Sequence, residues 1–315
     1  MATSFYLVLI ILNLITYTML HIDGAQAQNT TTISNHTNSL EIEALLSFKH
    51  NLEQGDDALP DWVEIIGSNN KSVVCTWTGV KCSRQWQSAS SSSMVVTSLQ
   101  LNGKNLKGTL SHHFAFGLPH LVVLDLSSNL LYGPIPDTLG NLHNLKMLNM
   151  ANNQFNGSIP SALGNCTHLT TLLLSFNALS GLIPASFANL GGSIVAFSAE
   201  GNLLSGPIPE WIGTWGLVDT ILLGGNRFTG QLIPEIGNCS SLTTLSLEEN
   251  QLIGPIPPEL CNARGLQALY LQSNHFMGTL DNAFQECTNL TEIHLNDNQL
   301  YGVIPSYLGK LPLVT

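Results

Sequence analysis

Positively charged residues are scarce in this sequence. Lys and Arg together number 10 in 315 residues, against 21 Asp and Glu, and the formal net charge is −11. Nucleic acids and anionic membrane surfaces are bound through clustered cations. The composition therefore argues against both kinds of partner and favours a neutral or basic one.

Motifs of common catalytic sites are also missing. The sequence contains no phosphate-binding glycine loop, no His-Glu-x-x-His and no Gly-x-Ser-x-Gly. The ten His residues are scattered apart from His112-His113, which without further ligands fits an exposed loop better than a metal site. Glu248 and Glu249 are chain neighbours that point apart, so they do not form a catalytic pair. We expect no catalytic residue, no metal and no cofactor.

Long apolar runs are absent except at the N-terminus. There Phe5–Leu20 is apolar, and the chain then turns polar and reaches Ala25-Gln26-Ala27, a small-x-small pattern typical of a signal-peptidase site. We predict a signal peptide over residues 1–27, although no Lys or Arg precedes the apolar run. The alternative is an uncleaved anchor, but polar residues such as Asn13 interrupt a run that is already short for a span of about 20 residues.

Seven Asn-x-Ser/Thr sequons agree with secretion and are predicted glycosylation sites. Chance is the alternative, because a chain rich in Asn and Ser makes sequons easily. The sequons are Asn29, Asn35, Asn70, Asn156, Asn165, Asn238 and Asn289.

What the sequence does contain is one Asn that recurs every 24 residues, with a single step of 25. Around it the pattern Leu-x-x-Leu-x-Leu-x-x-Asn-x-Leu-x-Gly-x-Ile-Pro is repeated, as in residues 121–136. Such a fixed period predicts one elongated solenoid rather than several globular domains. The Asn residues are Asn129, Asn153, Asn177, Asn202, Asn226, Asn250, Asn274 and Asn298. Nine units begin at Val96, Leu121, Leu145, Leu169, Ile194, Val218, Leu242, Leu266 and Leu290, and Val314 opens a tenth.

Each unit is predicted to contribute one short strand to a curved parallel sheet. The alternation Leu124-x-Leu126 sends two Leu inward and Asp125 outward. The buried Asn amides are expected to bond the backbone of their own and neighbouring turns. A Gly at the thirteenth position of every unit predicts a turn with positive φ or close backbone approach, and the following Ile-Pro predicts a segment outside the sheet.

Residues 28–94 are predicted to be a polar leader and a cap for the first unit. Residues 40–52 have helical spacing of apolar side chains, and Cys75 and Cys82 bracket a Trp-containing core. In an oxidising compartment this cysteine pair is expected to form a disulfide; free thiols or half of a zinc site are the alternatives. The serine-rich stretch Ser88–Ser93 is expected to be an exposed loop before the array at 95–315.

The four remaining cysteines lie inside the array. Cys166, Cys239 and Cys287 occupy the same, usually apolar, repeat position in units too far apart for a bridge, so we expect three buried thiols. Cys261 is one unit from Cys239 but at a different repeat position, which argues against a bond between them.

A ligand-binding surface is predicted from the fourth unit onward, on outward strand positions and on residues beside the repeated Asn. Alternation keeps these side chains out of the core, so aromatic residues there should be exposed. Aromatic anchors beside charged residues are typical of protein interfaces. A merely solvated acidic face is the alternative. The candidates are Phe176, Glu200, Asp219, Arg227, Glu248, Glu249, Tyr270, His275 and His294.

These units resemble the plant-specific extracellular leucine-rich repeat. Leu45-Leu46-x-Phe48-Lys49, followed by Cys75-x-Trp77-x-Gly79-Val80-x-Cys82, is similar to the N-terminal cap of plant receptor-like kinases. The resemblance covers residues 40–315. It implies an α/β repeat solenoid, namely a right-handed leucine-rich repeat superhelix with a parallel concave β-sheet and a helical, disulfide-bridged cap.

A narrower resemblance is to the excess-microsporocytes receptor kinase, which controls anther cell fate. It rests on four segments, Phe197–Asn202, Trp211–Trp215, Gly225–Phe228 and Glu259–Cys261.

The family resemblance implies the ligand-recognition region of a receptor at the outer face of the plasma membrane, acting in developmental signalling. It implies one membrane span, a cytoplasmic Ser/Thr kinase, a small secreted protein or peptide ligand, and a leucine-rich repeat co-receptor kinase of the somatic-embryogenesis type. The chain ends at Thr315 inside a repeat and contains neither span nor kinase, so we carry over no enzymatic activity. The alternative is a secreted leucine-rich repeat inhibitor of a cell-wall hydrolase.

Overall fold

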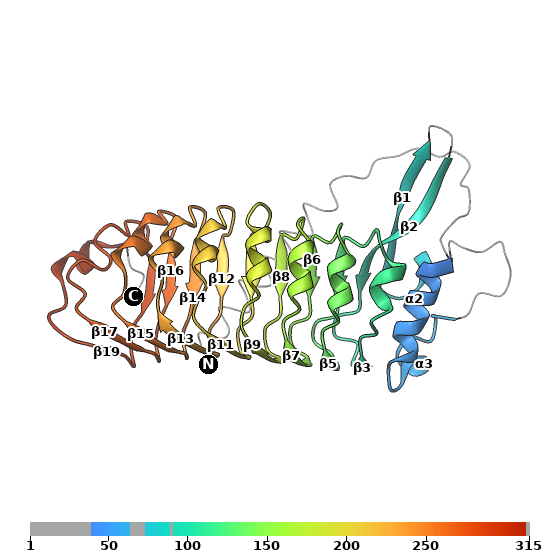
Figure 1. The fold of residues 1–315 in the computed structure, drawn as a ribbon, viewed down its shortest axis with the longest axis horizontal. Helices are drawn as coiled ribbons and strands as arrows, with labels where there is room; N and C mark the ends of the chain where they lie inside the picture. Colours follow the sequence, from blue (N-terminus) through green and yellow to red (C-terminus); the bar gives the residue numbers. More distant parts are fainter. Residues whose placement is uncertain (1–38, 64–72, 89–90, 313–315) are drawn as a thin grey trace.

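The computed structural model describes residues 39–63, 73–88 and 91–312, which form a long curved array of coils with a cap at one end (Figure 1). The predicted signal peptide and the sequons at Asn29, Asn35 and Asn70 lie outside these residues. No helix of the described part is long and apolar enough to span a bilayer.

The cap is built on aromatic packing around one helix. Helix α2 (Ser39–His50) is followed by α3 (Gly55–Ala58) and the 3₁₀ turn η2 (Val73–Thr76). Phe48 of α2 packs against Trp62 and Phe114, with ring centroids 6.2 and 5.6 Å apart, and Trp62 stacks on Trp77. These buried rings cover the first coil, as a solenoid end requires.

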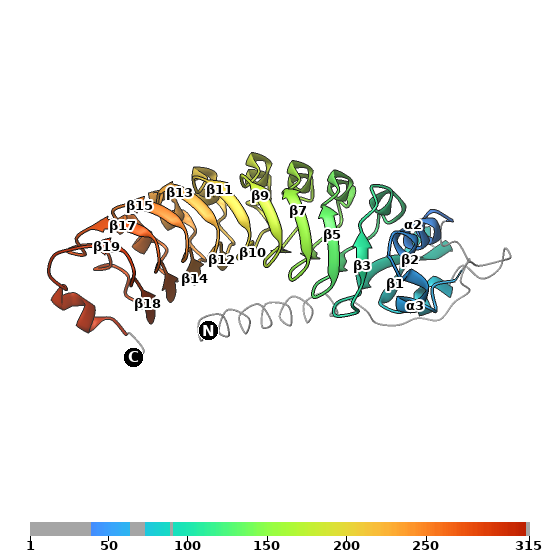
Figure 2. The same cartoon turned by 90° about the horizontal axis from the view of Figure 1, so that it is seen from below.

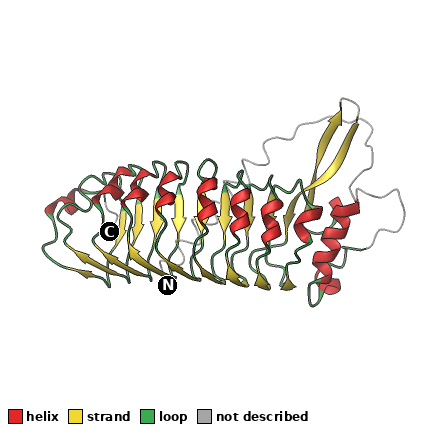
Figure 3. Cartoon of the chain, in the orientation of Figure 1, coloured by secondary structure: helices red, strands yellow, loops and turns green. Residues whose placement is uncertain are grey.

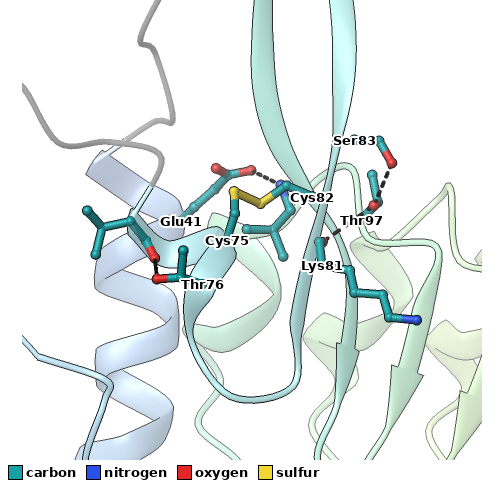
Figure 4. The surroundings of a disulfide bond; sticks show 9 residues. Glu41, Cys75, Thr76, Lys81, Cys82, Ser83 and Thr97 are labelled. Carbon is teal, nitrogen blue, oxygen red and sulfur yellow. Dashed lines mark hydrogen bonds between the residues drawn. A yellow bond between two sulfur atoms is a disulfide. The ribbon is translucent and has the colours of Figure 1, made fainter. Parts of the chain in front are cut away.

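The predicted disulfide between Cys75 and Cys82 is confirmed, with Cα atoms 5.5 Å apart. Figure 4 shows it beside Glu41 of α2, whose Oε1 accepts a hydrogen bond of 3.0 Å from the backbone N–H of Val96. The bridge and this bond tie the cap to the start of the array.

The prediction of an exposed loop at Ser88–Ser93 is wrong. Strands β1 (Val80–Ser88) and β2 (Ser91–Gln100) form an antiparallel hairpin, and Ser92 and Ser93 are buried. Composition pointed to a loop, but a paired strand satisfies the serine backbone regardless of side-chain type. The far end of the hairpin projects from the array (Figure 1).

One sheet runs the length of the array and lies on the inside of its curve (Figure 2). It has ten strands, in the order β1-β2-β4-β6-β8-β10-β12-β14-β16-β18, and is parallel from β2 onward. The strands of the second to ninth units are β4 (Val123–Asp125), β6 (Met147–Asn149), β8 (Thr171–Leu173), β10 (Ala196–Ser198), β12 (Thr220–Leu222), β14 (Thr244–Ser246), β16 (Ala268–Tyr270) and β18 (Glu292–His294). The predicted concave parallel sheet is therefore confirmed.

A second sheet, which we did not predict, has nine parallel strands. After the repeated Asn the chain stays extended long enough to pair with the next unit. The Gly at the thirteenth repeat position then turns it; at Gly254, for example, φ is +80°. The strands are β3 (Lys107–Thr109), β5 (Leu130–Pro134), β7 (Gln154–Ser158), β9 (Ala178–Gly181), β11 (Leu203–Gly206), β13 (Arg227–Gln231), β15 (Gln251–Gly254), β17 (His275–Gly278) and β19 (Gln299–Leu300).

Short 3₁₀ turns complete the coils and stack in a row along the array (Figure 3). Six of them directly follow a Pro in extended conformation, as at Pro209, and one more begins with a Pro. They are η3 (Phe114–Gly117), η4 (Asp137–Asn141), η5 (Ser161–Asn165), η6 (Ala185–Leu190), η7 (Glu210–Thr214), η8 (Pro234–Asn238), η9 (Pro258–Asn262) and η10 (Ser306–Lys310).

The repeated Asn residues form the expected internal ladder. The amide nitrogen of Asn226 donates to the carbonyl of Leu223 in its own unit at 3.1 Å and to that of Ala199 in the preceding unit at 2.9 Å. Its Oδ1 accepts from the backbone N–H of Leu204 at 3.0 Å. One buried side chain thus satisfies backbone groups of two coils.

The cysteines of the array depart from the prediction in one place. Cys166 and Cys239 are buried free thiols, as expected, but Cys287 is bonded to Cys261 across a Cα–Cα distance of 4.6 Å. The two residues are 26 positions apart, which is one period plus two, so they lie in adjacent coils. The prediction weighed Cys261 only against Cys239. Cys261 lies in η9 and is bonded to Cys287 of the next coil instead.

Removing a ladder Asn should be costly because it orphans buried backbone groups. We expect Asn226→Ala to lower the free energy of unfolding by roughly 2–4 kcal/mol. Chemical denaturation followed by circular dichroism measures it. The exposed Asn262→Ala is the matched control and should change stability by less than about 0.5 kcal/mol; equal effects of the two variants would contradict the ladder's role.

The cysteine pairing can be checked by alkylation and mass spectrometry. Burial raises the pKa of the Cys166 and Cys239 thiols to about 11, so the folded chain should resist iodoacetamide at neutral pH. After unfolding without reductant only these two should be labelled, while non-reducing digestion should yield a peptide linking Cys261 to Cys287. A link from Cys261 to Cys239, or alkylation of Cys287, would show that the pairing is wrong.

Candidate ligand-binding surface

The concave surface is made by the first and third residues of the three-residue strands β4 to β18 of the ten-stranded sheet. The middle residues, such as Leu172 and Phe197, belong to the hydrophobic core. Their neighbours point the other way: Leu173, Leu222 and Tyr270 lie outside that core although they are also buried. This division follows the strand alternation on which the prediction was based.

The structure corrects the expectation that Tyr270 is exposed. Only 1% of Tyr270 is accessible, and its ring packs against His294 of the next strand with centroids 5.1 Å apart. Alternation keeps the side chain out of the core, but neighbouring strands bring other side chains against it. Glu200 and Glu248 are likewise 7% exposed, whereas Glu249 is exposed.

Seven of the nine predicted candidates fall into two groups. Glu200 and Glu248 follow strands β10 and β14, Tyr270 and His294 end β16 and β18, and Asp219 precedes β12, so these share the concave side. Arg227 and His275 instead begin β13 and β17 and are exposed on the second sheet. The residue after the repeated Asn starts the second strand, which we had not foreseen.

Phe176 and Glu249 share a further repeat position, directly before the ladder Asn. Both have positive φ, at +56° and +52°. Phe176 leans over Gly201 of the next unit, where an added Cβ would lie 2.6 Å from its ring. The ring is half-buried rather than freely exposed.

Three carboxylates gather around a glycine pair. Glu200 of the fifth unit, Gly224 of the sixth and Glu248 of the seventh occupy one repeat position. The Glu248 carboxylate reaches back over Gly224, where an added Cβ would lie 2.6 Å from its Cδ, and the Ser246 hydroxyl donates to its Oε2 at 2.6 Å. Glu249 extends the negative charge at the exposed edge.

This clustering changes the acidity of both buried groups. Burial, and then the charges of Glu248 and Glu249, raise the pKa of Glu200 to about 7. Burial also raises the pKa of Glu248, opposed mainly by the hydrogen bond from Ser246 and weakly by His294. Within the cluster, Glu200 is thus the carboxyl whose pKa lies near neutrality.

Four outward strand positions carry apolar residues that were not predicted. Val123, Met147, Leu173 and Leu222 are buried but lie outside the hydrophobic core. Their signal was present in uninterrupted apolar runs such as residues 172–174, where an outward position carries Leu instead of a polar residue.

The predicted sequons within the described residues leave the concave sheet free. Asn156 lies in β7 of the second sheet, Asn165 and Asn238 end η5 and η8, and Asn289 precedes β18; all four are exposed. Glycans at these positions would point away from the concave surface.

Other kinds of site find no support among the described residues. They contain no group of three or more His, Cys, Asp and Glu side chains placed to hold a metal ion. Two shallow hollows near Lys49 and Lys107 lie at the cap and include none of the candidate residues.

Comparison with known families agrees with this architecture. Residues 38–83 match the leucine rich repeat N-terminal domain, and residues 95–155 match the leucine rich repeat family. A further leucine rich repeat model matches residues 168–190, 241–263 and 289–311. The chain is a leucine-rich repeat protein.

Its relatives include plant receptor kinases. The leucine-rich repeat receptor-like serine/threonine-protein kinase SKM1 of Arabidopsis thaliana is 37% identical over 101 residues, a match that covers 32% of this chain and 9% of the kinase. The ectodomain of GASSHO1/SCHENGEN3 from Arabidopsis thaliana, solved in complex with CASPARIAN STRIP INTEGRITY FACTOR 2, superposes with a TM-score of 0.79 at 34% identity. That superposition covers 87% of this chain and 32% of the ectodomain.

A plant ice-binding protein is also similar, with a TM-score of 0.72 at 27% identity, over 88% of this chain and 84% of that protein. The matched regions thus amount to a small part of the kinases but most of the ice-binding protein. The relatives and the repeat models agree on the leucine-rich repeat architecture, and several of these relatives are plant receptor-like kinases.

The raised pKa of Glu200 predicts a pH-dependent stability. A carboxyl that is easier to protonate when folded stabilises the fold at low pH, and this stability is lost as pH rises from about 4.5 through about 7. Glu200→Gln removes the titration, so it should raise the free energy of unfolding at pH 8 by on the order of 2 kcal/mol and leave it nearly unchanged at pH 4. Denaturant titrations at both pH values measure this. The exposed Glu210→Gln is the control, and the prediction fails if both variants behave alike.

Proposed function

We propose that this chain is the ligand-recognition region of a plant leucine-rich repeat receptor-like kinase and binds a small secreted protein or peptide on its concave surface. The observation that carries the proposal is the composition of that surface: the half-buried ring of Phe176 lies against Gly201, beside the acidic group of Glu200, Glu248 and Glu249. Apolar anchors flanked by charge are what protein interfaces use, and one sign of charge favours an opposite partner.

The similarity to a receptor ectodomain solved with a secreted factor supports this proposal. By the same family resemblance, we propose an extracellular location at the plasma membrane, secretion through cleavage of residues 1–27, and a leucine-rich repeat co-receptor kinase. We retain the excess-microsporocytes receptor type as a finer proposal, together with its role in developmental signalling. A secreted hydrolase inhibitor is not favoured by the receptor kinases among its relatives.

Charge should speed the association of the ligand, and apolar contact should lengthen the lifetime of the complex. A displayed library of secreted plant peptides and small proteins, selected on the secreted chain, should yield binders of net positive charge. For these binders we expect Glu248→Lys with Glu249→Lys to weaken affinity at least tenfold at low salt and less at high salt, because charges are screened. Phe176→Ala should mainly raise the dissociation rate, because its half-buried ring is the accessible aromatic of this surface.

The control is Glu210→Lys with Glu235→Lys, which makes the same charge change in η7 and η8, outside the concave sheet. Surface plasmon resonance at two salt concentrations, with folding verified by circular dichroism, gives the rates. Unchanged binding in both concave variants would exclude this surface as the ligand site.

A further inference from the structure

The glycine pair at the centre of the acidic cluster leaves a gap one coil wide in the row of side chains. At the two repeat positions that follow the concave strand, the fifth, sixth and seventh units carry Glu200-Gly201, Gly224-Gly225 and Glu248-Glu249. The sixth unit therefore contributes only backbone between two units that contribute carboxylates. At about 4.8 Å per coil, the backbones of the fifth and seventh units are about 10 Å apart, and the Glu248 carboxylate lies over the intervening Gly224.

The carboxylates on either side face this gap. The Glu248 side chain bends over Gly224, since a Cβ there would lie 2.7 and 2.9 Å from its two carboxylate oxygens. Glu200 is close enough to Glu248 and Glu249 for their charges to oppose its ionisation. Its Oε2 is buried and has no hydrogen-bond partner.

No cation of the described residues balances this group. The ion pairs among them are Lys49 with Asp56, Lys107 with Glu53, and His294 with Glu292. Only His294 has a favourable influence on the cluster, a weak one on Glu248. A buried acceptor without a donor, next to a second carboxylate, is an unfavourable arrangement that a donor with positive charge would relieve.

We propose that the gap over Gly224 and Gly225 receives one basic side chain of the ligand, whose ammonium or guanidinium group lies between the carboxylates of Glu200 and Glu248. This rests on the concave ligand surface proposed above and names the chemical group recognised there. A cation between two carboxylates stabilises their charged forms, so its binding releases a proton from Glu200 and strengthens as the pH rises through about 7. Glu249 and His294 are the other titratable groups that act on the pair.

Three blocked tripeptides test the proposal on the secreted chain: acetyl-Gly-Lys-Gly-amide, its Arg equivalent, and its norleucine equivalent, which has the Lys stem without the charge. Saturation-transfer NMR titrations at pH 8 should show the Lys or Arg peptide binding at least tenfold more tightly than the norleucine peptide. At pH 5 this preference should fall at least threefold. The better of the two basic peptides identifies which cation the gap fits.

Two variants separate occupancy of the gap from the general charge of the surface. Glu200→Gln with Glu248→Gln should abolish the preference for the basic peptides. Gly224→Ala removes no charge but places a methyl group against the Glu248 carboxylate, and φ at Gly224 is not in the left-handed region, so the chain should fold and still lose most of the preference. Glu210→Gln with Glu235→Gln is the charge-matched control and should leave it intact.

Equal binding of all three peptides, or a preference that survives Gly224→Ala, would contradict the proposed binding of a basic side chain at this position. The library binders separate this failure from that of the proposed function. Binders that respond to Phe176→Ala but not to Gly224→Ala would show ligand recognition on the concave surface without a cation held at the glycine pair. Binders that respond to neither would remove both.

Discussion

Every coil of this protein depends on its neighbours for its polar backbone groups. The buried Asn ladder does most of this: Asn226 reaches into both its own and the preceding coil, and its carbonyl oxygen serves the N–H of Leu204. An unpaired buried amide or carbonyl costs about 1–3 kcal/mol, so an insertion that shifts one Asn out of step would penalise two coils together. What the ladder requires is that each Asn reaches the preceding coil, which steps of 24 and 25 residues both allow, and chemical variety is confined to positions that the ladder and core do not use.

Stacking in register has a second effect on those free positions. Residues one period apart are held at neighbouring strand positions whether or not their side chains attract each other. Glu200 and Glu248 are two periods apart, on either side of the unit that carries Gly224, and each is fixed by its strand and the core beneath it. A globular surface would relax such repulsion by moving a loop. The array cannot, so it can hold like charges together for a partner to neutralise.

The features that were predicted from sequence are those that depend on a short local pattern or on a pattern that repeats along the chain. The parallel concave strands, the Asn ladder and the Cys75–Cys82 bridge each follow from a short pattern. The second sheet was missed because its strands carry no alternation strong enough to signal pairing, as in the residues Ala178–Gly181. The hairpin was missed because a serine run has no side-chain pattern, although its backbone pairs well. Burial of Tyr270 depends on side chains of other strands, which alternation within one strand does not describe.

The Cys261–Cys287 bond has a consequence for how such an array comes apart. Each coil contacts only the coils beside it, so local unfolding on the C-terminal side of the eighth unit can spread only through that unit. The covalent link between the seventh and eighth units opposes this spread, because the eighth unit cannot separate from its neighbour. The acidic group lies in the fifth to seventh units, on the N-terminal side of the eighth, so the proposed ligand site would keep its shape during such unfolding.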